Sequence, residues 1–134
     1  MGNMKIIPAF LMLVLTVMAA RSESFASSNA VEMIALKQAL QKAYTTYYST
    51  NDETGKLYKA WRELEKTHLP KMLSLAQQEP ETQSACDVVV WIALNAVAER
   101  GPFFTNRLQA LDYLAKYHST NSTVGPLCSY LGRY

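Results

Sequence analysis

The stretch ACDVVVWIALN, residues 85–95, decides the fold class of this chain. Apolar side chains fall on nearly every side of it, and the apolar pattern continues to Ala98. Three consecutive valines would also suit a buried strand, but strands usually span about 4–8 residues. A helix that is apolar all round is normally buried. The stretch therefore predicts a buried central helix, capped by Thr82 or Ser84 and reaching about Arg100.

The segments on both sides of this helix have the spacing of amphipathic helices. Apolar residues recur three or four positions apart, and Gly and Pro separate the segments. The expected helices cover residues 31–48, about 57–68, about 70–79, about 104–117 and 124–131. Pro70 is expected to open the third of these, because proline is tolerated in a first helical turn. The sequence predicts an all-α single domain, an irregular bundle of five or six helices arranged as helical hairpins, over residues 27–134.

Trp91 is the largest side chain of the central helix, and we expect it at the centre of the hydrophobic core. Leu94 on the same helix is expected to pack beside it. Leu111 and Leu114 supply the apolar face of the helix that ends near Tyr117.

Composition excludes several classes of protein. The chain has 134 residues, 49% hydrophobic and 18% charged, which is typical of one folded domain. A net charge of +2 argues against a strongly basic nucleic-acid binder. Five Gly and five Pro are too few for the frequent turns of a β-sandwich. Two Cys are too few for a small disulfide-framework protein.

The N-terminus has the pattern of a secretory signal peptide. Lys5 precedes an apolar run over residues 6–20, which is shorter than the roughly 18–20 residues that span a bilayer. Ser24 and Ala26 place small residues before a cut after Ala26. We expect residues 1–26 to be the signal peptide, with cleavage after Ala20 or an uncleaved anchor as alternatives. The mature chain would be exported, periplasmic or extracellular, with no membrane span.

No motif in the sequence predicts a catalytic, cofactor or metal site. His68 and His118 each stand alone near an expected helix end, so we expect no metal site. Glu63 and Glu65 are two positions apart on a helix and point to different sides, so both are expected to be solvated. The sequence has no G-x-S-x-G motif and no Gly-rich phosphate loop.

Two further patterns leave alternatives open. Tyr44, Tyr47, Tyr48 and Tyr58 flank the first expected break, either as core packing with hydroxyls that reach water or as a recognition surface. The core interpretation is the more common one. Asn121 begins an Asn-Ser-Thr sequon, which would be a chance match in a bacterial protein.

Cys86 and Cys128 lie on apolar faces of two expected helices. An exported chain could pair them in a disulfide, but cysteine is also a good small core residue. We expect two separate buried thiols, with the Cys86–Cys128 disulfide as the alternative. Neither is expected to be catalytic, because Asp87 beside Cys86 would raise a thiol pKa.

Four stretches resemble one known family. Residues 85–95 are similar to A-x-D-A-L-x-W-V-x-x-N, residues 110–118 (ALDYLAKYH) to A-L-x-x-L-A-x-x-H, and residues 125–131 (GPLCSYL) to G-P-x-C-x-x-L. Residues 73–76 before Pro80 fit F-L-x-L-A. The family is the helical region ahead of the thioredoxin-like (redoxin) domain in exported proteins of planctomycete-type bacteria. The resemblance covers about residues 36–131 and is better after Leu69.

The resemblance implies an α-helical module of an envelope protein. The family's redox chemistry belongs to a following domain with paired cysteines, whereas residues 125–128 (GPLC) hold one. Two functions are therefore expected. The first is a non-catalytic helical interaction or accessory module of the bacterial cell envelope, with a protein partner still to be identified. The alternative is a truncated or split part of a thiol–disulfide oxidoreductase whose catalytic domain is absent from this chain.

Overall fold

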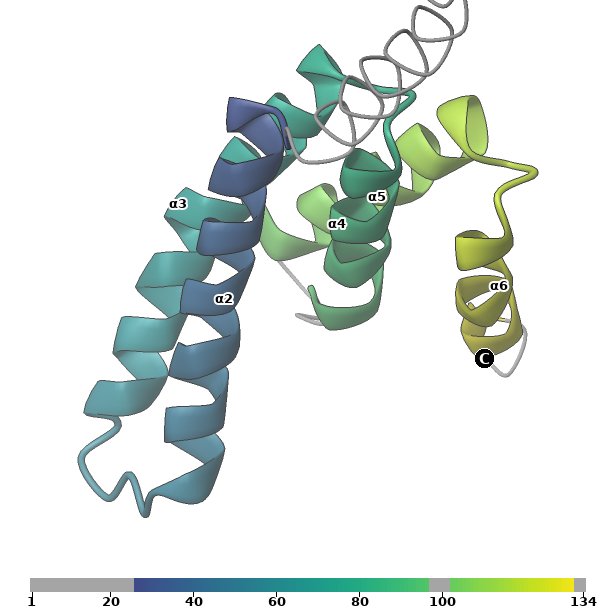
Figure 1. Ribbon diagram of the computed structural model, residues 1–134. Helices are drawn as coiled ribbons and strands as arrows, with labels where there is room; N and C mark the ends of the chain where they lie inside the picture. Colours follow the sequence, from purple (N-terminus) through teal and green to yellow (C-terminus); the bar gives the residue numbers. More distant parts are fainter. Residues whose placement is uncertain (1–25, 97–101, 132–134) are drawn as a thin grey trace, which may run out of the picture.

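A computed structural model describes residues 26–96 and 102–131, and it is helical throughout, apart from short connections (Figure 1). The described residues form five α-helices and one 3-10 turn: α2 (Ser28–Ser49), α3 (Lys56–Gln78), α4 (Gln83–Asn95), α5 (Pro102–Tyr117), η2 (Ser122–Val124) and α6 (Gly125–Leu131). They contain no strand, and the all-α prediction is confirmed. The expected signal peptide falls almost entirely on residues 1–25, which lie outside the described residues.

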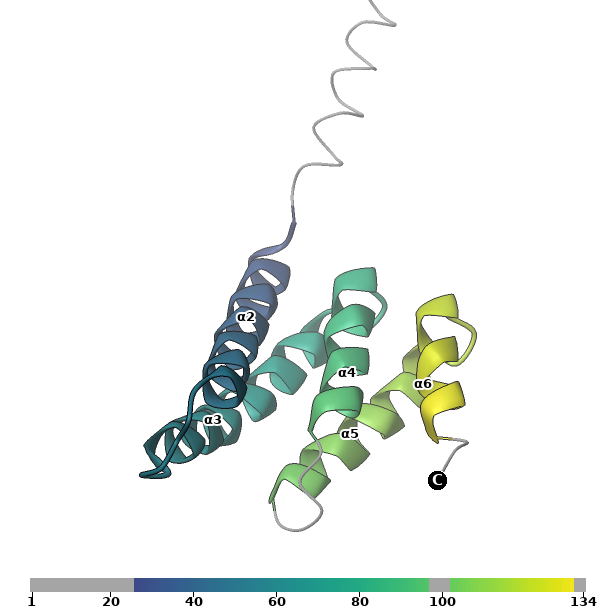
Figure 2. The same cartoon turned by 90° about the horizontal axis from the view of Figure 1, so that it is seen from below.

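Helices α2 and α3 form a long antiparallel hairpin, with α4 and α5 beside it and α6 on the side of α4 away from the hairpin (Figures 1 and 2). Ser27 caps α2, because its hydroxyl oxygen accepts a 3.1 Å hydrogen bond from the Ala30 backbone N–H. The same hydroxyl donates to the Glu79 carboxylate at 2.6 Å, just after α3 ends. Glu32 and Lys71 add an exposed ion pair between the two helices. These contacts fasten the start of α2 to the end of α3.

The turn between α2 and α3 lies where the sequence predicts a break. Gly55 has φ +67°, a left-handed conformation that side-chain-bearing residues rarely adopt. Gly55 has no side chain with which to cap α3. Asp52 takes over that role, since its carboxylate accepts a 2.9 Å hydrogen bond from the Tyr58 backbone N–H in the first turn.

Pro70 lies inside α3, and the expectation that it opens a separate helix is wrong. An interior proline removes one backbone hydrogen bond and costs about 3 kcal/mol. Leu69 and Met72 flank it, and each is at most 1% exposed. Burying one such side chain contributes about 1.5–3 kcal/mol. The continuous buried face therefore outweighs the proline, and the described residues form the smaller of the two expected numbers of helices, five.

Helix α4 is the buried helix that its sequence predicts. Thr82 caps it, with its side-chain oxygen accepting from the Ala85 N–H at 3.2 Å. The helix ends at Asn95 instead of continuing toward Arg100, which lies outside the described residues. Its buried residues are Ala85, Cys86, Val88, Val89, Val90, Ile92 and Ala93. They pack against α2, α3 and α5.

Trp91 does not occupy the centre of the core. It is half-buried and packs against the core from its edge, as do Leu94 and Leu111, whereas Leu114 is 2% exposed and lies within the core. The fully buried stripe of α4 includes Val89 and Ile92, and the indole lies at its border. Tryptophan is rarely fully buried because of its size.

Tyr113 joins α5 to the end of α3. Its hydroxyl lies 3.0 Å from the carbonyl oxygen of Ala76 and 3.0 Å from that of Pro80, and donates to both. Burial, with smaller effects of Cys86 and Tyr117, raises the pKa of Tyr113 to about 12.

In the described part of the chain, no helix combines the length and apolar character needed to cross a membrane.

Candidate functional site

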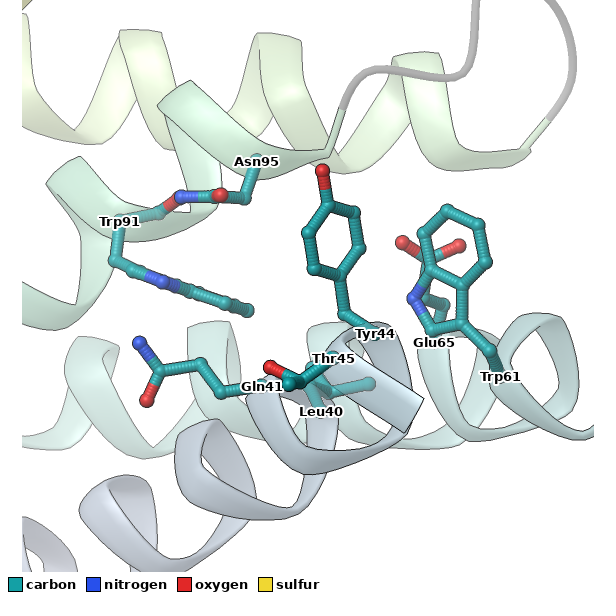
Figure 3. A pocket seen from close by; sticks show the side chains of 8 residues that line it. All are labelled: Leu40, Gln41, Tyr44, Thr45, Trp61, Glu65, Trp91 and Asn95. Atoms are coloured by element: carbon teal, nitrogen blue, oxygen red, sulfur yellow. The ribbon is translucent and has the colours of Figure 1, made fainter. Parts of the chain in front are cut away.

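An aromatic cleft opens where the α2–α3 hairpin meets α4. It consists of two adjoining hollows, of about 330 Å³ and 360 Å³, which share Tyr44, Trp61, Glu65 and Asn95 in their walls. Figure 3 shows the inner hollow, with residues of α2 and α3 on one side and Trp91 and Asn95 of α4 on the other. The inner hollow adds Leu40, Gln41, Thr45 and Trp91 to the shared set, and the outer hollow adds Tyr47, Tyr48, Tyr58 and Arg62.

Aromatic rings form the outer part of the cleft around Trp61. Tyr47 stacks on its indole, with ring centroids 5.6 Å apart and planes 24° apart. Tyr44 and Tyr58 meet it edge-on, at 5.4 Å and 5.9 Å. Both geometries suit the quadrupoles of aromatic rings. Tyr44, Tyr48 and Tyr58 are 46%, 65% and 44% exposed, so the core interpretation is wrong for these three.

A buried carboxylate lies in the wall of this cleft. Glu65 is only 5% exposed, and its Oε2 accepts a 2.9 Å hydrogen bond from Nη1 of Arg62. Burial raises the pKa of Glu65, and the charge and hydrogen bond of Arg62 offset part of that rise. The Arg62 guanidinium also lies 5.8 Å from the Trp61 ring centroid and 5.9 Å from that of Tyr58. The carboxylate is thereby held in place by a cation that is itself held by two rings.

The expectation that both carboxylates are solvated is wrong for Glu65. Glu63 is exposed and pairs with Lys66 at 2.5 Å. Glu65 instead continues the buried stripe of α3, four residues before Leu69 and seven before Met72. That spacing was present in the sequence. A helix break at Pro70 would separate Glu65 from this stripe, whereas one continuous helix places Glu65 on the same face as Leu69 and Met72.

Neutral polar groups complete the inner hollow. Asn95 donates from Nδ2 to the Trp91 carbonyl at 2.9 Å, and its Oδ1 has no partner among the residues described. Gln41 and Thr45 are exposed on α2, and within the described ranges their side chains make no hydrogen bond. Figure 3 shows the Trp91 ring at one end of the hollow and the Tyr44 ring between it and Trp61. The cleft therefore combines aromatic faces with groups that can donate and accept hydrogen bonds.

The two histidines lie apart from the cleft. His68 lies within α3, not at a helix end, with its Nδ1 2.8 Å from the Thr67 hydroxyl. His118 is 5% exposed beside Tyr113, with ring centroids 5.7 Å apart. Its Nε2 is buried without a partner among the described residues. No group of three His, Cys, Asp or Glu in the described ranges could hold a metal ion.

The cysteines are both free and differ in environment. Cys86 is fully buried on α4, and burial together with Asp87 raises its thiol pKa. Cys128 on α6 is exposed, so the expectation of two buried thiols is wrong for Cys128. Its position on the outer side of a short helix explains the difference, because Leu127 takes the buried position there.

Asn121 has a structural position in the turn before α6. Its Oδ1 accepts from the Thr123 N–H at 3.0 Å, and its Nδ2 donates to the Gln83 side chain at 2.9 Å. The sequon asparagine thus caps η2 and connects it to the start of α4.

Comparisons of the chain with protein-family models, with curated proteins and with solved structures find no match to it. The resemblance of residues 36–131 to the helical region of redoxin proteins therefore stays a prediction.

Proposed function

We propose that this chain is a non-catalytic interaction module of the bacterial cell envelope, which binds its partner in the aromatic cleft. In this proposal residues 1–26 are a signal peptide, and residues 27–134 fold as an irregular bundle of helical hairpins. The sequence patterns of the N-terminus and the resemblance to an envelope family support the location.

The observation that carries the proposal is the exposure of the cleft's tyrosines. Tyr44, Tyr48 and Tyr58 keep 44–65% of their surface open, although each lies against other rings. Tyrosine and tryptophan are enriched where proteins bind partners, because they add large contact area and a polar tip. The rings are also held in place by one another, so little ordering is needed on binding.

The polar groups of the cleft are suited to binding rather than to proton transfer. The Glu65 carboxylate is already engaged by Arg62. The other polar groups among the described residues of the inner hollow are two amides, two hydroxyls and two indole N–H groups (Gln41, Asn95, Thr45, Tyr44, Trp61 and Trp91). Amides and hydroxyls orient a ligand through hydrogen bonds but do not act as bases near neutral pH.

Retention of the purified chain 27–134 on isolated envelope tests the function. Gln41→Arg places a long charged side chain in the cleft at an exposed helix position. Gln109→Arg makes the same change on α5, at an exposed position away from the cleft. We expect wild type and Gln109→Arg to be retained alike, and Gln41→Arg to be lost. Equal retention of all three would refute the role of the cleft.

Export is tested separately, by fractionating cells that express the full chain. The proposal expects the protein outside the cytoplasm, with a mature N-terminus at Ser27. A chain found in the cytoplasm with residue 1 still present would contradict it.

A further inference from the structure

We propose that the inner hollow of the aromatic cleft binds a neutral sugar ring, as a free sugar or as a unit of a glycan. This inference rests on the proposed function and names the chemistry that the cleft recognises.

The size and shape of the hollow fit one ring. Its volume of about 330 Å³ lies at the lower end of the range for small-molecule sites, about 300–1,000 Å³. The ring of Trp91 lies at one end of the hollow, and the ring of Tyr44 lies between it and Trp61 (Figure 3). A pyranose carries C–H groups on its two faces, and these apolar faces gain dispersion and hydrophobic contact against aromatic rings.

The polar groups of the hollow match the rim of such a ring. Each sugar hydroxyl both donates and accepts, and loses free energy if it is buried without partners. Gln41 offers an amide donor and an acceptor, and Thr45 offers a hydroxyl. Asn95 Oδ1 and Glu65 Oε1 are acceptors with no hydrogen-bond partner in the described structure. Donors and acceptors thus lie beside the aromatic rings, as hydroxyls around an apolar ring require.

The charges of the cleft favour a neutral ligand. An ammonium ion would be attracted by aromatic faces and a carboxylate. Here Arg62 already supplies a cation to Glu65 and lies near the rings of Trp61 and Tyr58. An anion would meet the carboxylate of Glu65, the one charged side chain among the described residues that line the inner hollow. A neutral ligand meets neither obstacle.

The test follows the two indole N–H signals by NMR, because the chain has two tryptophans and both line the cleft. Glucose, galactose, N-acetylglucosamine, chitotriose and choline are titrated into residues 27–134. We expect at least one sugar to shift the Trp91 signal saturably, and choline to leave it unchanged. Equal affinity for a monosaccharide and chitotriose indicates a free sugar, and tighter binding of chitotriose indicates a glycan.

The two arginine variants test whether the sugar binds in the inner hollow. Gln41→Arg should weaken sugar binding about tenfold or more, and Gln109→Arg should not change it. The NMR spectrum of each variant reports whether it is folded. If Gln41→Arg does not fold, Gln41→Ala takes its place. A shift with choline alone, or no shift with any sugar, overturns the inference. If no sugar binds while Gln41→Arg still abolishes retention on envelope, the inference fails and the proposed function stands.

Discussion

Glu65 accepts a 2.9 Å hydrogen bond from Arg62, one turn earlier on α3, and is only 5% exposed although it carries an ionisable carboxyl. A carboxylate at such a position destabilises a fold unless it is paired. The pair joins the hydrophobic core to the aromatic cleft, since Glu65 continues the buried stripe of α3 and Arg62 lies against Trp61.

The first prediction concerns the pH dependence of stability. Burial raises the pKa of Glu65 above its ordinary value near 4.5, so the folded chain holds the proton at pH values where the unfolded chain has lost it. The free energy of unfolding should therefore fall as pH rises from about 4.5 through the raised pKa. In Glu65→Gln this decline in the free energy of unfolding should be absent. Urea denaturation at pH values from about 4 to about 8 measures it.

Glu63→Gln is the matched control, because Glu63 is an exposed carboxylate on the same helix. Its pH profile should follow that of wild type. If the free energies of unfolding of Glu65→Gln and wild type depend on pH in the same way, burial does not raise the pKa of the Glu65 carboxyl.

The second prediction concerns the core. Leu114 is 2% exposed, so Leu114→Ala should lower the free energy of unfolding by about 2–5 kcal/mol by leaving a cavity. Leu108 on the same helix is 46% exposed, and Leu108→Ala should cost less than about 1 kcal/mol. Chemical denaturation of both variants measures the difference. Similar costs for the two would mean that α5 packs through another face.

The third prediction concerns the connection between α5 and α3. Tyr113→Phe removes the hydroxyl that donates to the carbonyls of Ala76 and Pro80. Since Ala76 is fully buried, the loss should be about 1–3 kcal/mol. Tyr117→Phe, at a 37% exposed site, should change stability by less than about 0.5 kcal/mol. A neutral Tyr113→Phe would show that these hydrogen bonds contribute nothing.

The fourth prediction separates the two thiols. Native protein treated with a thiol-alkylating reagent should be labelled at Cys128, which is exposed, while Cys86 should react only after denaturation. Mass spectrometry of the peptides reads both sites, and Cys128→Ser should abolish native labelling. An unreduced chain that takes no label even when denatured would reveal a Cys86–Cys128 disulfide instead.

Local patterns in the sequence were enough to predict the helical class and several helix ends. Thr82 as one of two candidate caps of α4, the turn before Gly55 and the end of α5 near Tyr117 follow from residue chemistry that acts within a few positions. Local patterns do not predict that α3 continues through Pro70, because tertiary burial of Leu69 and Met72 outweighs a local penalty.

The cleft could be predicted only in part. The tyrosines near the first turn were visible as a cluster, but their convergence with Trp91 and Asn95 depends on how α4 lies against the hairpin. Periodicity shows which residues share a face of one helix, and it does not show which faces of different helices meet.

Photocrosslinking in living cells tests most directly whether the aromatic cleft is the binding site. A benzophenone side chain replaces Tyr44 in the cleft or, as control, Tyr117 on α5; both positions are exposed. We predict an ultraviolet-dependent adduct from position 44, lost when Gln41→Arg is added, and none from position 117. An adduct from position 117 with none from position 44 would contradict the account.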